Sequence, residues 1–115
     1  MTLESNLVIA ENYYKLFAEK NIEGMAKYLH PDVQFTAPLA KMTGKDLVLE
    51  AARKLASLFN KLSIGAKFSA ENQVMVVYDF DFPDPIGNVP TAALLIVQDG
   101  LIIKIELFYD ARPFG

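Results

Sequence analysis

The clearest structural signal in the chain lies in residues 92–109, AALLIVQDGLIIKIELFY. Its centre, Asp99-Gly100, is typical of a two-residue hairpin turn, because such turns need residues that tolerate a positive φ. This turn brings Leu94 opposite Ile105, and directly paired residues share one face of a sheet. The face that packs against the rest of the protein is therefore expected to carry Ala92, Leu94, Ile96, Ile103, Ile105, Leu107 and Tyr109.

The opposite face of this hairpin is interrupted only by Lys104 and Glu106, so it is too apolar to be left to water over its whole extent. A second copy of the chain is the simplest cover for such a face. The sequence therefore predicts a homodimer through the outer face of the sheet. The apolar residues expected on this face are Ala93, Leu95, Val97, Ile102 and Phe108.

Upstream of the hairpin, apolar residues alternate with a period of two, which indicates further strands. We expect strands at residues 33–37, 63–70, 74–82, 89–97 and 101–110. One face of the second strand is expected to carry Ile64, Ala66, Phe68 and Ala70, and the inward face of the third to carry Val74, Val76, Tyr78, Phe80 and Phe82.

The first half of the chain has helical periodicity and predicts helices at residues 3–20 and 21–28 and a third that starts at 43–46. Thr2 is expected to cap the first, and Pro31 to end the second. The third helix should bury Leu47, Ala51, Leu55 and Leu58 or Phe59. Helices followed by strands predict a single α+β domain over residues 1–115, with about three N-terminal helices packed on one face of a bent antiparallel sheet.

Composition narrows the classes of function. The chain has no cysteine and one histidine, so a thiolate or multi-histidine metal site within it is excluded, and no metal or cofactor is expected. A net charge of −3 disfavours nucleic acid as a partner. The longest apolar run, residues 92–97, is far shorter than the ~20 residues that cross a membrane. Without cysteines or a signal-peptide pattern in the first residues, a cytoplasmic location is expected.

Three stretches resemble the opening of nuclear transport factor 2-like domains, and within that superfamily the SnoaL-like and ketosteroid-isomerase-like groups. They are Glu11–Phe17 (ENYYKLF), Asn21–Met25 (NIEGM) and Leu29–Phe35 (LHPDVQF). The helix start Gly44–Asp46 and the closing Glu106–Asp110 also fit. The resemblance implies a curved antiparallel sheet wrapped around helices as a cone with an open mouth. Because isomerases, cyclases, dehydratases, epoxide hydrolases and binding domains share this fold, it does not settle the chemistry.

Ketosteroid isomerases use an aspartate base together with a tyrosine and a protonated aspartic acid that hold the oxyanion. The resemblance places these groups at Tyr13, at Ala37 before Pro38, and at Leu94, or at Ala93 if the hairpin register slips by one. Only the tyrosine keeps a functional group. Steroid isomerisation through buried carboxylates is therefore not expected, and an isomerase, cyclase or lyase activity of another kind stays open.

Tyr13 is the candidate catalytic residue, as a hydrogen-bond donor to a bound carbonyl, and packing in the core is its alternative role. An aromatic interior would favour a flat, apolar guest, although the same side chains could simply fill the cone. The predicted ligand-binding residues are Phe17, Phe35, Phe59, Tyr78, Phe80, Leu94, Ile105 and Tyr109. The leading hypothesis is a small protein that binds an apolar or aromatic molecule, and the alternative is a non-catalytic interaction module.

The remaining polar residues are expected outside the cavity. His30, a possible base with Asp32, is interpreted as a turn residue because it precedes a proline. Asp79 and Asp81 alternate with inward aromatic residues, so both should point to solvent or to an interface. Residues 110–113 are expected to form a solvated tail, the alternative being a charge pair that closes the mouth.

Overall fold

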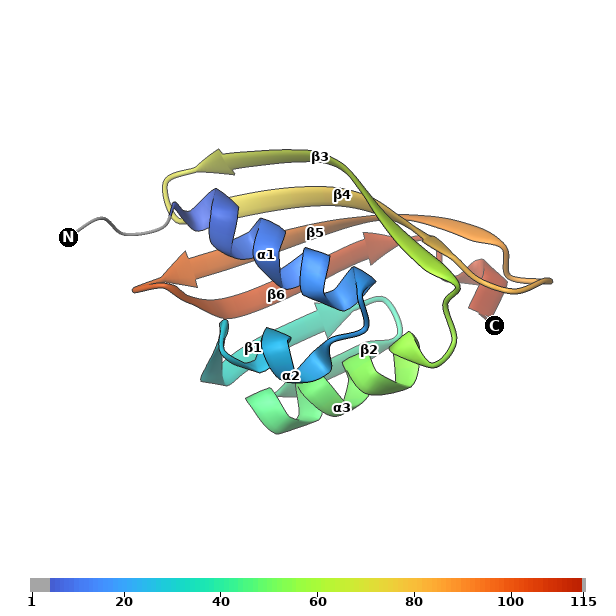
Figure 1. Cartoon of the computed structure of the whole chain (residues 1–115), viewed down its shortest axis with the longest axis horizontal. Coiled ribbons are helices and arrows are strands. Elements are labelled where there is room, and N and C mark those ends of the chain that lie inside the picture. The colour runs from blue at the N-terminus through green and yellow to red at the C-terminus, as the bar shows by residue number, and fades with distance from the viewer. Residues whose placement is uncertain (1–4, 115) are drawn as a thin grey trace.

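The computed structural model describes residues 5–114, and it shows three helices on one side of a curved six-stranded sheet (Figure 1). The predicted α+β class is confirmed. The helices are α1 (Asn6–Ala18), α2 (Ile22–Ala26) and α3 (Lys45–Ala56), and a short 3-10 helix, η1 (Arg112–Phe114), follows the last strand. The strands are β1 (Leu29–Ala37), β2 (Ala40–Thr43), β3 (Lys61–Ala70), β4 (Gln73–Asp81), β5 (Asn88–Gln98) and β6 (Leu101–Tyr109).

Local capping explains where the first helix begins. The Ser5 side chain accepts a hydrogen bond from the backbone N–H of Val8 at 3.2 Å, which satisfies one of the free donors of α1. The cap predicted at Thr2 lies outside the described residues. Helix α2 ends at Ala26, earlier than predicted, and β1 already begins at Leu29. Within residues 5–114 no helix is long and apolar enough to cross a membrane.

The strand order is β2-β1-β6-β5-β4-β3, and one neighbouring pair is parallel. Strand β1 runs parallel to β6, whereas the other neighbours are antiparallel, so the sheet is mixed rather than wholly antiparallel. A parallel pair needs a long connection, and here the whole of β2 to β5 supplies it. Strand β2, which the sequence pattern did not predict, forms a tight hairpin with β1 in which Ala37 pairs with Ala40.

The predicted turn of the last hairpin is confirmed. Asp99 and Gly100 both have positive φ, 53° and 81°, and Val97 pairs with Ile102 as expected. Beyond that pair the register shifts by one residue, because a β-bulge leaves Ile103 without a partner. From the bulge onward Leu95, rather than Leu94, lies opposite Ile105.

The bulge has a simple electrostatic reason. The tight turn places Val97 and Ile102 together on the inward face, where both are buried. An unbroken alternation after Ile102 would carry Lys104 and Glu106 into the core, and each buried charge would cost several kcal/mol. The bulge returns both charged residues to the outer face and brings Ile105 inward.

Two predictions made from the unbroken register are therefore wrong. Leu94, expected in the interior, lies half-buried on the outer face. Leu95, Val97 and Ile102, expected on an outer dimer face, are fully buried in the core. Of the residues predicted for that outer face, Phe108 is the one whose side chain is exposed there.

A second bulge changes the faces of β3. Gly65 and Ala66 together oppose Val77, so the residues after them are displaced by one. Phe68, predicted to share a face with Ile64, is therefore 64% exposed on the opposite, outer face. Glycine suits the bulge because a Cβ on Gly65 would lie only 3.3 Å from the Val77 carbonyl oxygen. Neighbouring Lys67 turns inward, where it forms an ion pair with Glu11 of α1.

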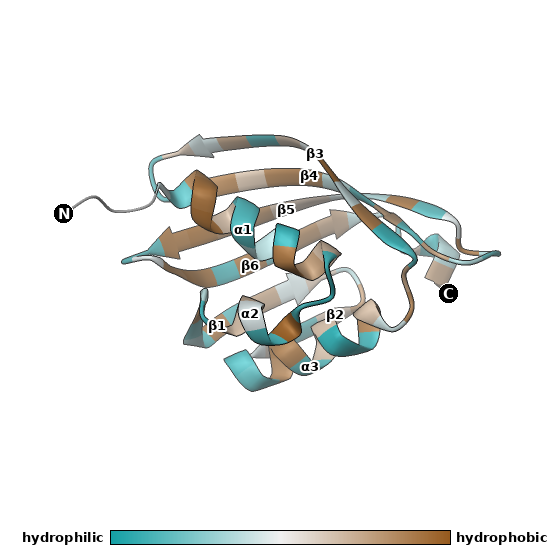
Figure 2. Cartoon of the chain, in the orientation of Figure 1, coloured by the Kyte–Doolittle hydropathy of each residue, from teal (hydrophilic) through white to brown (hydrophobic). Residues whose placement is uncertain are grey.

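Strand β4 follows the prediction along its whole length. Figure 2 shows that much of β4 is hydrophobic, and every residue expected to face inward is buried. These residues are Val74, Val76, Tyr78 and Phe80, with Phe82 just after the strand. In contrast, α3 is rotated relative to the prediction: it buries Val48, Ala52 and Ala56, whereas Leu47 is 53% exposed. The two small alanines let α2 and β1 pack closely against α3.

Alanine substitutions test the observed register. Leu95→Ala should lower the free energy of unfolding by about 2–5 kcal/mol, because it leaves a cavity in a closed core. Leu94→Ala should lower it by about 1 kcal/mol or less, because its side chain is on the outer face. Urea denaturation of both variants measures the difference. Equal losses, or a larger loss for Leu94→Ala, would contradict the bulged register.

Candidate functional site

A cavity lies between the concave face of the sheet and helices α1 and α3, and it has two adjoining chambers. The larger has a volume of about 300 Å³ and opens to solvent beside the exposed side chains of Leu39 and Leu58. The smaller, of about 60 Å³, lies deeper, beside α1. Both chambers share walls made by Phe35, Ala51, Leu55, Phe80 and Leu107.

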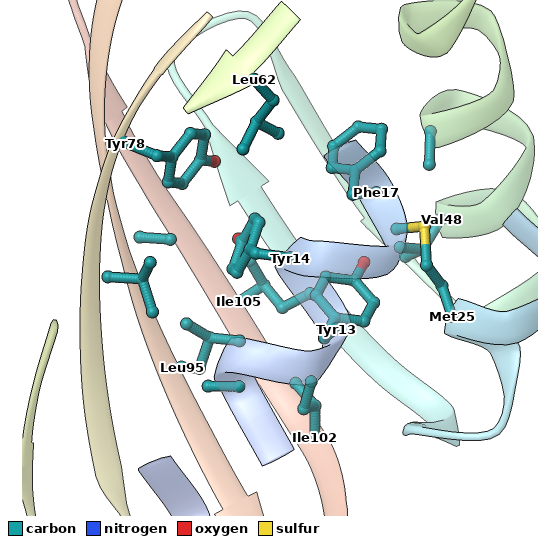
Figure 3. Packing of buried hydrophobic residues seen from close by; sticks show 14 of the residues in the cluster. Tyr13, Tyr14, Phe17, Met25, Val48, Leu62, Tyr78, Leu95, Ile102 and Ile105 are labelled. Carbon is teal, nitrogen blue, oxygen red and sulfur yellow. The ribbon is translucent and has the colours of Figure 1, made fainter. Parts of the chain in front are cut away.

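Three tyrosines form the polar part of the smaller chamber: Tyr13 and Tyr14 on α1 and Tyr78 on β4 (Figure 3). The ring of Tyr14 lies between the other two, with centroid distances of 5.1 Å to Tyr13 and 4.7 Å to Tyr78. Burial raises the pKa of all three phenols above the usual value of 10, and the neighbouring Tyr78 raises that of Tyr14 further. All three are therefore neutral at pH 7 and cannot act as bases.

The hydroxyl of Tyr13 is suited to a guest. Burial and the nearby Tyr14 raise its pKa, and no hydrogen bond from the described residues contributes to that shift. No fully buried side-chain oxygen or nitrogen of the described residues lacks a hydrogen-bond partner, so the Tyr13 hydroxyl is not a buried, unpaired group. A carbonyl oxygen entering the smaller chamber would accept a hydrogen bond from this hydroxyl, and the volume of about 60 Å³ leaves room for such a group.

The larger chamber has few polar groups. Thr91 is buried in its wall and donates a hydrogen bond from Oγ1 to the Val89 carbonyl at 3.2 Å. Burial raises the pKa of Tyr109, an effect that the backbone of Leu39 opposes. Lys54 contributes the one charged side chain among the described residues of this wall. Since these residues include no aspartate, glutamate or histidine in either chamber, the site can bind and polarise a guest but holds no ordinary general base.

Most of the predicted pocket residues lie in the walls of the two chambers. Phe59 instead packs behind the wall, with ring centroids 5.5 Å from Phe17 and 5.2 Å from Phe80, and lines neither chamber. Leu94 points to the other side of the sheet, because β5 alternates without interruption and its neighbours Ala93 and Leu95 are the buried, inward residues. The predicted residues that do line the cavity are Tyr13, Phe17, Phe35, Tyr78, Phe80, Ile105 and Tyr109.

The positions that the ketosteroid isomerase resemblance assigns to acids carry none in the structure. Ala37 lies in the wall of the larger chamber, where a base would stand. The observed register turns Ala93, rather than Leu94, toward the interior, and its methyl group cannot hold a proton. Both positions therefore lack the carboxylate that this mechanism needs.

The polar residues predicted to lie outside the cavity do so. His30 lines a shallow groove on the outer side of β1, and its Nδ1 accepts a hydrogen bond from the backbone N–H of Asp32 at 2.9 Å. Asp79 and Asp81 are on the outer face of β4, where Asp79 accepts a hydrogen bond from the Asn88 side chain at 3.4 Å. None of these groups reaches either chamber.

Sequence reasoning missed the C-terminal part of the wall. Residues 110–113 are mostly exposed, as expected of a solvated tail, but the Phe114 ring after them packs 5.4 Å from Phe82 and 5.7 Å from Tyr109 and lines the larger chamber. Arg112 donates two hydrogen bonds to the Asp110 carboxylate from Nε and one from Nη2, which lowers the pKa of Asp110 to about 2. An aromatic residue directly after Arg112-Pro113 was the available signal.

Comparison with known families agrees with this architecture. A model of the SnoaL-like domain matches residues 10–105. The chain belongs to the SnoaL-like family. Comparison of this SnoaL-like chain with curated proteins gives no match.

Several solved structures share the fold of the SnoaL-like chain. A nuclear transport factor 2-like protein of unknown function from Cytophaga hutchinsonii is 18% identical, with a TM-score of 0.87 over 98% of this chain and 96% of that one. A steroid delta-isomerase from Pseudomonas aeruginosa is 18% identical, with a TM-score of 0.78 over 96% and 83%. A de novo designed protein with a curved β-sheet is 20% identical, with a TM-score of 0.85 over 97% and 90%. Because such different proteins share the shape, the likeness establishes the fold alone.

The buried tyrosines predict a loss of stability in alkali. Each has a pKa near 10 when unfolded and a higher one when folded, so above pH 10 the unfolded state releases protons first. The free energy of unfolding should be unaffected below pH 10 and then fall by about 1.4 kcal/mol per pH unit for each buried tyrosine. In Tyr14→Phe the free energy of unfolding should fall less steeply with pH, because one buried tyrosine no longer contributes to the slope. Urea titrations between about pH 8 and 12 measure the slope.

Lysine side chains also titrate in this pH range. Comparing the slope of the unchanged protein with that of Tyr14→Phe isolates the contribution of one tyrosine, because both proteins contain the same lysines. Tyr28→Phe, outside the tyrosine cluster, is the control. If Tyr14→Phe and the unchanged protein lose stability with the same slope, the Tyr14 phenol is not protected by burial.

Proposed function

We propose that the protein binds a small, flat, apolar molecule in the larger chamber. The observation that carries this proposal is an open chamber of about 300 Å³ whose wall is almost entirely apolar and rich in aromatic rings. A closed apolar cavity of about 150 Å³ holds benzene, so a chamber twice that size suits about two fused rings. Phe35, Phe80 and Phe82 offer ring faces and edges to such a guest.

Tyr13 orients the guest in this proposal. The smaller chamber adjoins the larger one through Phe35 and Phe80, so a carbonyl on one end of the guest can extend toward the tyrosines. The neutral hydroxyl of Tyr13 donates to that oxygen. Such a hydrogen bond fixes orientation and withdraws electron density from the carbonyl, which is the contribution this site makes to any isomerase, cyclase or lyase reaction. Binding is therefore the primary function, and a reaction would depend on a proton acceptor carried by the substrate or by water.

Matched ligands test the proposal. Acetylnaphthalene and naphthalene should both bind, because both fit the larger chamber. Tyr13→Phe should weaken acetylnaphthalene by about 2- to 12-fold, the value of one hydrogen bond, and leave naphthalene nearly unchanged. Ala37→Phe should abolish binding of both, because the new ring occupies the chamber. Fluorescence titration follows both ligands, since the chain has no tryptophan to interfere.

Tyr28→Phe is the matched control, because it removes a hydroxyl that lines neither chamber. If neither ligand binds the unchanged protein, the proposed function fails. If both ligands bind but Tyr13→Phe has no effect on either, the chamber binds apolar molecules and Tyr13 is a packing residue.

The outer face of the sheet supports a second proposal, that the protein forms a homodimer. The observed register places an apolar surface there: Phe68 lies beside Met75, Met75 beside Leu94, and Ala92 beside Phe108. Phe68 and Phe108 are 64% and 47% exposed. Neighbouring apolar residues on an exposed face mark interaction surfaces. This face would equally serve a non-catalytic interaction module, and a second copy of the chain is the partner proposed here.

Changing the charge of this surface tests the homodimer. Phe108→Asp should convert a dimer to a monomer without unfolding it, because an isologous interface would bring two new carboxylates together. Leu47→Asp is the control, since Leu47 is exposed to a similar degree on α3, away from this face. Light scattering at tens of micromolar protein, roughly the scale of weak dimer dissociation, gives the mass. A monomeric unchanged protein would contradict the proposal.

A further inference from the structure

The mouth of the larger chamber has an asymmetric charge. Four residues of one segment contribute to the wall: Ala51, Lys54 and Leu55 lie along one side of helix α3, and Leu58 follows just after the helix ends. Three are apolar. The Lys54 side chain is 78% exposed, so its ammonium group lies at the opening rather than inside. A molecule in the chamber therefore has apolar contacts along its body and one cation at the solvent end.

The Lys54 ammonium group is only weakly engaged by the protein. Its partner is Glu50, one turn earlier, with Nζ and Oε1 3.7 Å apart and the Glu50 side chain 60% exposed. Exposed pairs of this kind contribute little and exchange readily. Arg112, near Phe114 of the same wall, is instead held by three hydrogen bonds to Asp110. Lys54 is thus the cation that can turn toward a bound molecule.

We infer that the ligand is an amphiphilic carboxylate, a conclusion that rests on the proposed function. The aromatic body fills the larger chamber, and the carboxylate stays at the mouth beside Lys54. The reverse orientation would bury the carboxylate among Phe35, Phe80 and the neutral tyrosines, where the walls hold no cation to offset its desolvation. One lysine balances one negative charge, whereas a phosphate dianion would leave excess charge near Glu50.

The charge of the whole chain makes this inference specific. Its net charge of −3 repels anions in general, so a preference for a carboxylate must come from a local cation. Naphthoate and naphthamide, substituted at the same ring position, form a matched pair with one negative charge and none. At pH 7 and low salt, naphthoate should bind about 2- to 5-fold more tightly, the value of an exposed ion pair, and added salt should remove the difference.

Three variants of α3 should change the preference for naphthoate over naphthamide in different directions. Lys54→Gln should abolish the preference for naphthoate and leave the affinity for naphthamide unchanged. Glu50→Gln should increase the preference, because it frees Lys54 and removes a nearby negative charge. Arg53→Gln removes the same charge from the adjacent position, but Arg53 lines a groove beside Lys20 and Asn21 rather than the chamber, so it should have no effect.

The outcomes separate the inference from the proposed function. If neither naphthyl compound binds the unchanged protein, the chamber is not a binding site and both proposals fail. If both bind with equal affinity, or if Lys54→Gln and Arg53→Gln alter naphthoate binding equally, the apolar site stands and the carboxylate inference is overturned. Loss of the naphthoate preference in Lys54→Gln alone supports it.

Discussion

The cavity depends on keeping the charged residues of β6 out of the concave face of the sheet. The tight turn at Asp99-Gly100 orients Val97 and Ile102 inward, and without a correction the following alternation would bury Lys104 and Glu106. A single bulged residue avoids that cost, which would be several kcal/mol for each charge. The same bulge brings Ile105, Leu107 and Tyr109 into the interior, so an electrostatic constraint in one strand determines the wall of the cavity.

The cavity that results is apolar, with hydroxyl groups in place of ionised ones. Tyr13, Tyr14 and Tyr78 stay protonated because burial disfavours the phenolate, and Ala37 stands where the isomerase resemblance would place a carboxylate. A steroid delta-isomerase and a designed protein have a similar shape, so the shape alone does not determine a function. For this SnoaL-like chain, the interior supports orientation and hydrogen bonding of an apolar guest more than proton transfer.

The inner face of the sheet lines the proposed ligand site, and the outer face forms the proposed dimer surface. The two bulges determine which residues of β3 and β6 lie on each face. The regular alternation of β5 places Leu94 on the outer surface, the bulge in β6 keeps Lys104 and Glu106 on that side, and the bulge in β3 places Phe68 there. The outer surface thereby gains the apolar residues proposed for a homodimer. On the inner side, α3 and the Phe114 segment complete the mouth, where Lys54 supplies the only charge of the described wall.

The sequence by itself determined the fold class, the turn at Asp99-Gly100 and the inward face of β4, because these follow from local backbone preference and from an uninterrupted period of two. It also located most of the cavity residues, because aromatic residues on the inward face of a strand must be buried. Only the tertiary structure decided the bulges, the parallel pairing of β1 with β6 and the packing of Phe114. A bulge is chosen by what burial would cost in the assembled sheet, and a parallel neighbour by the shape of a long connection. Neither quantity is contained in a short window of sequence.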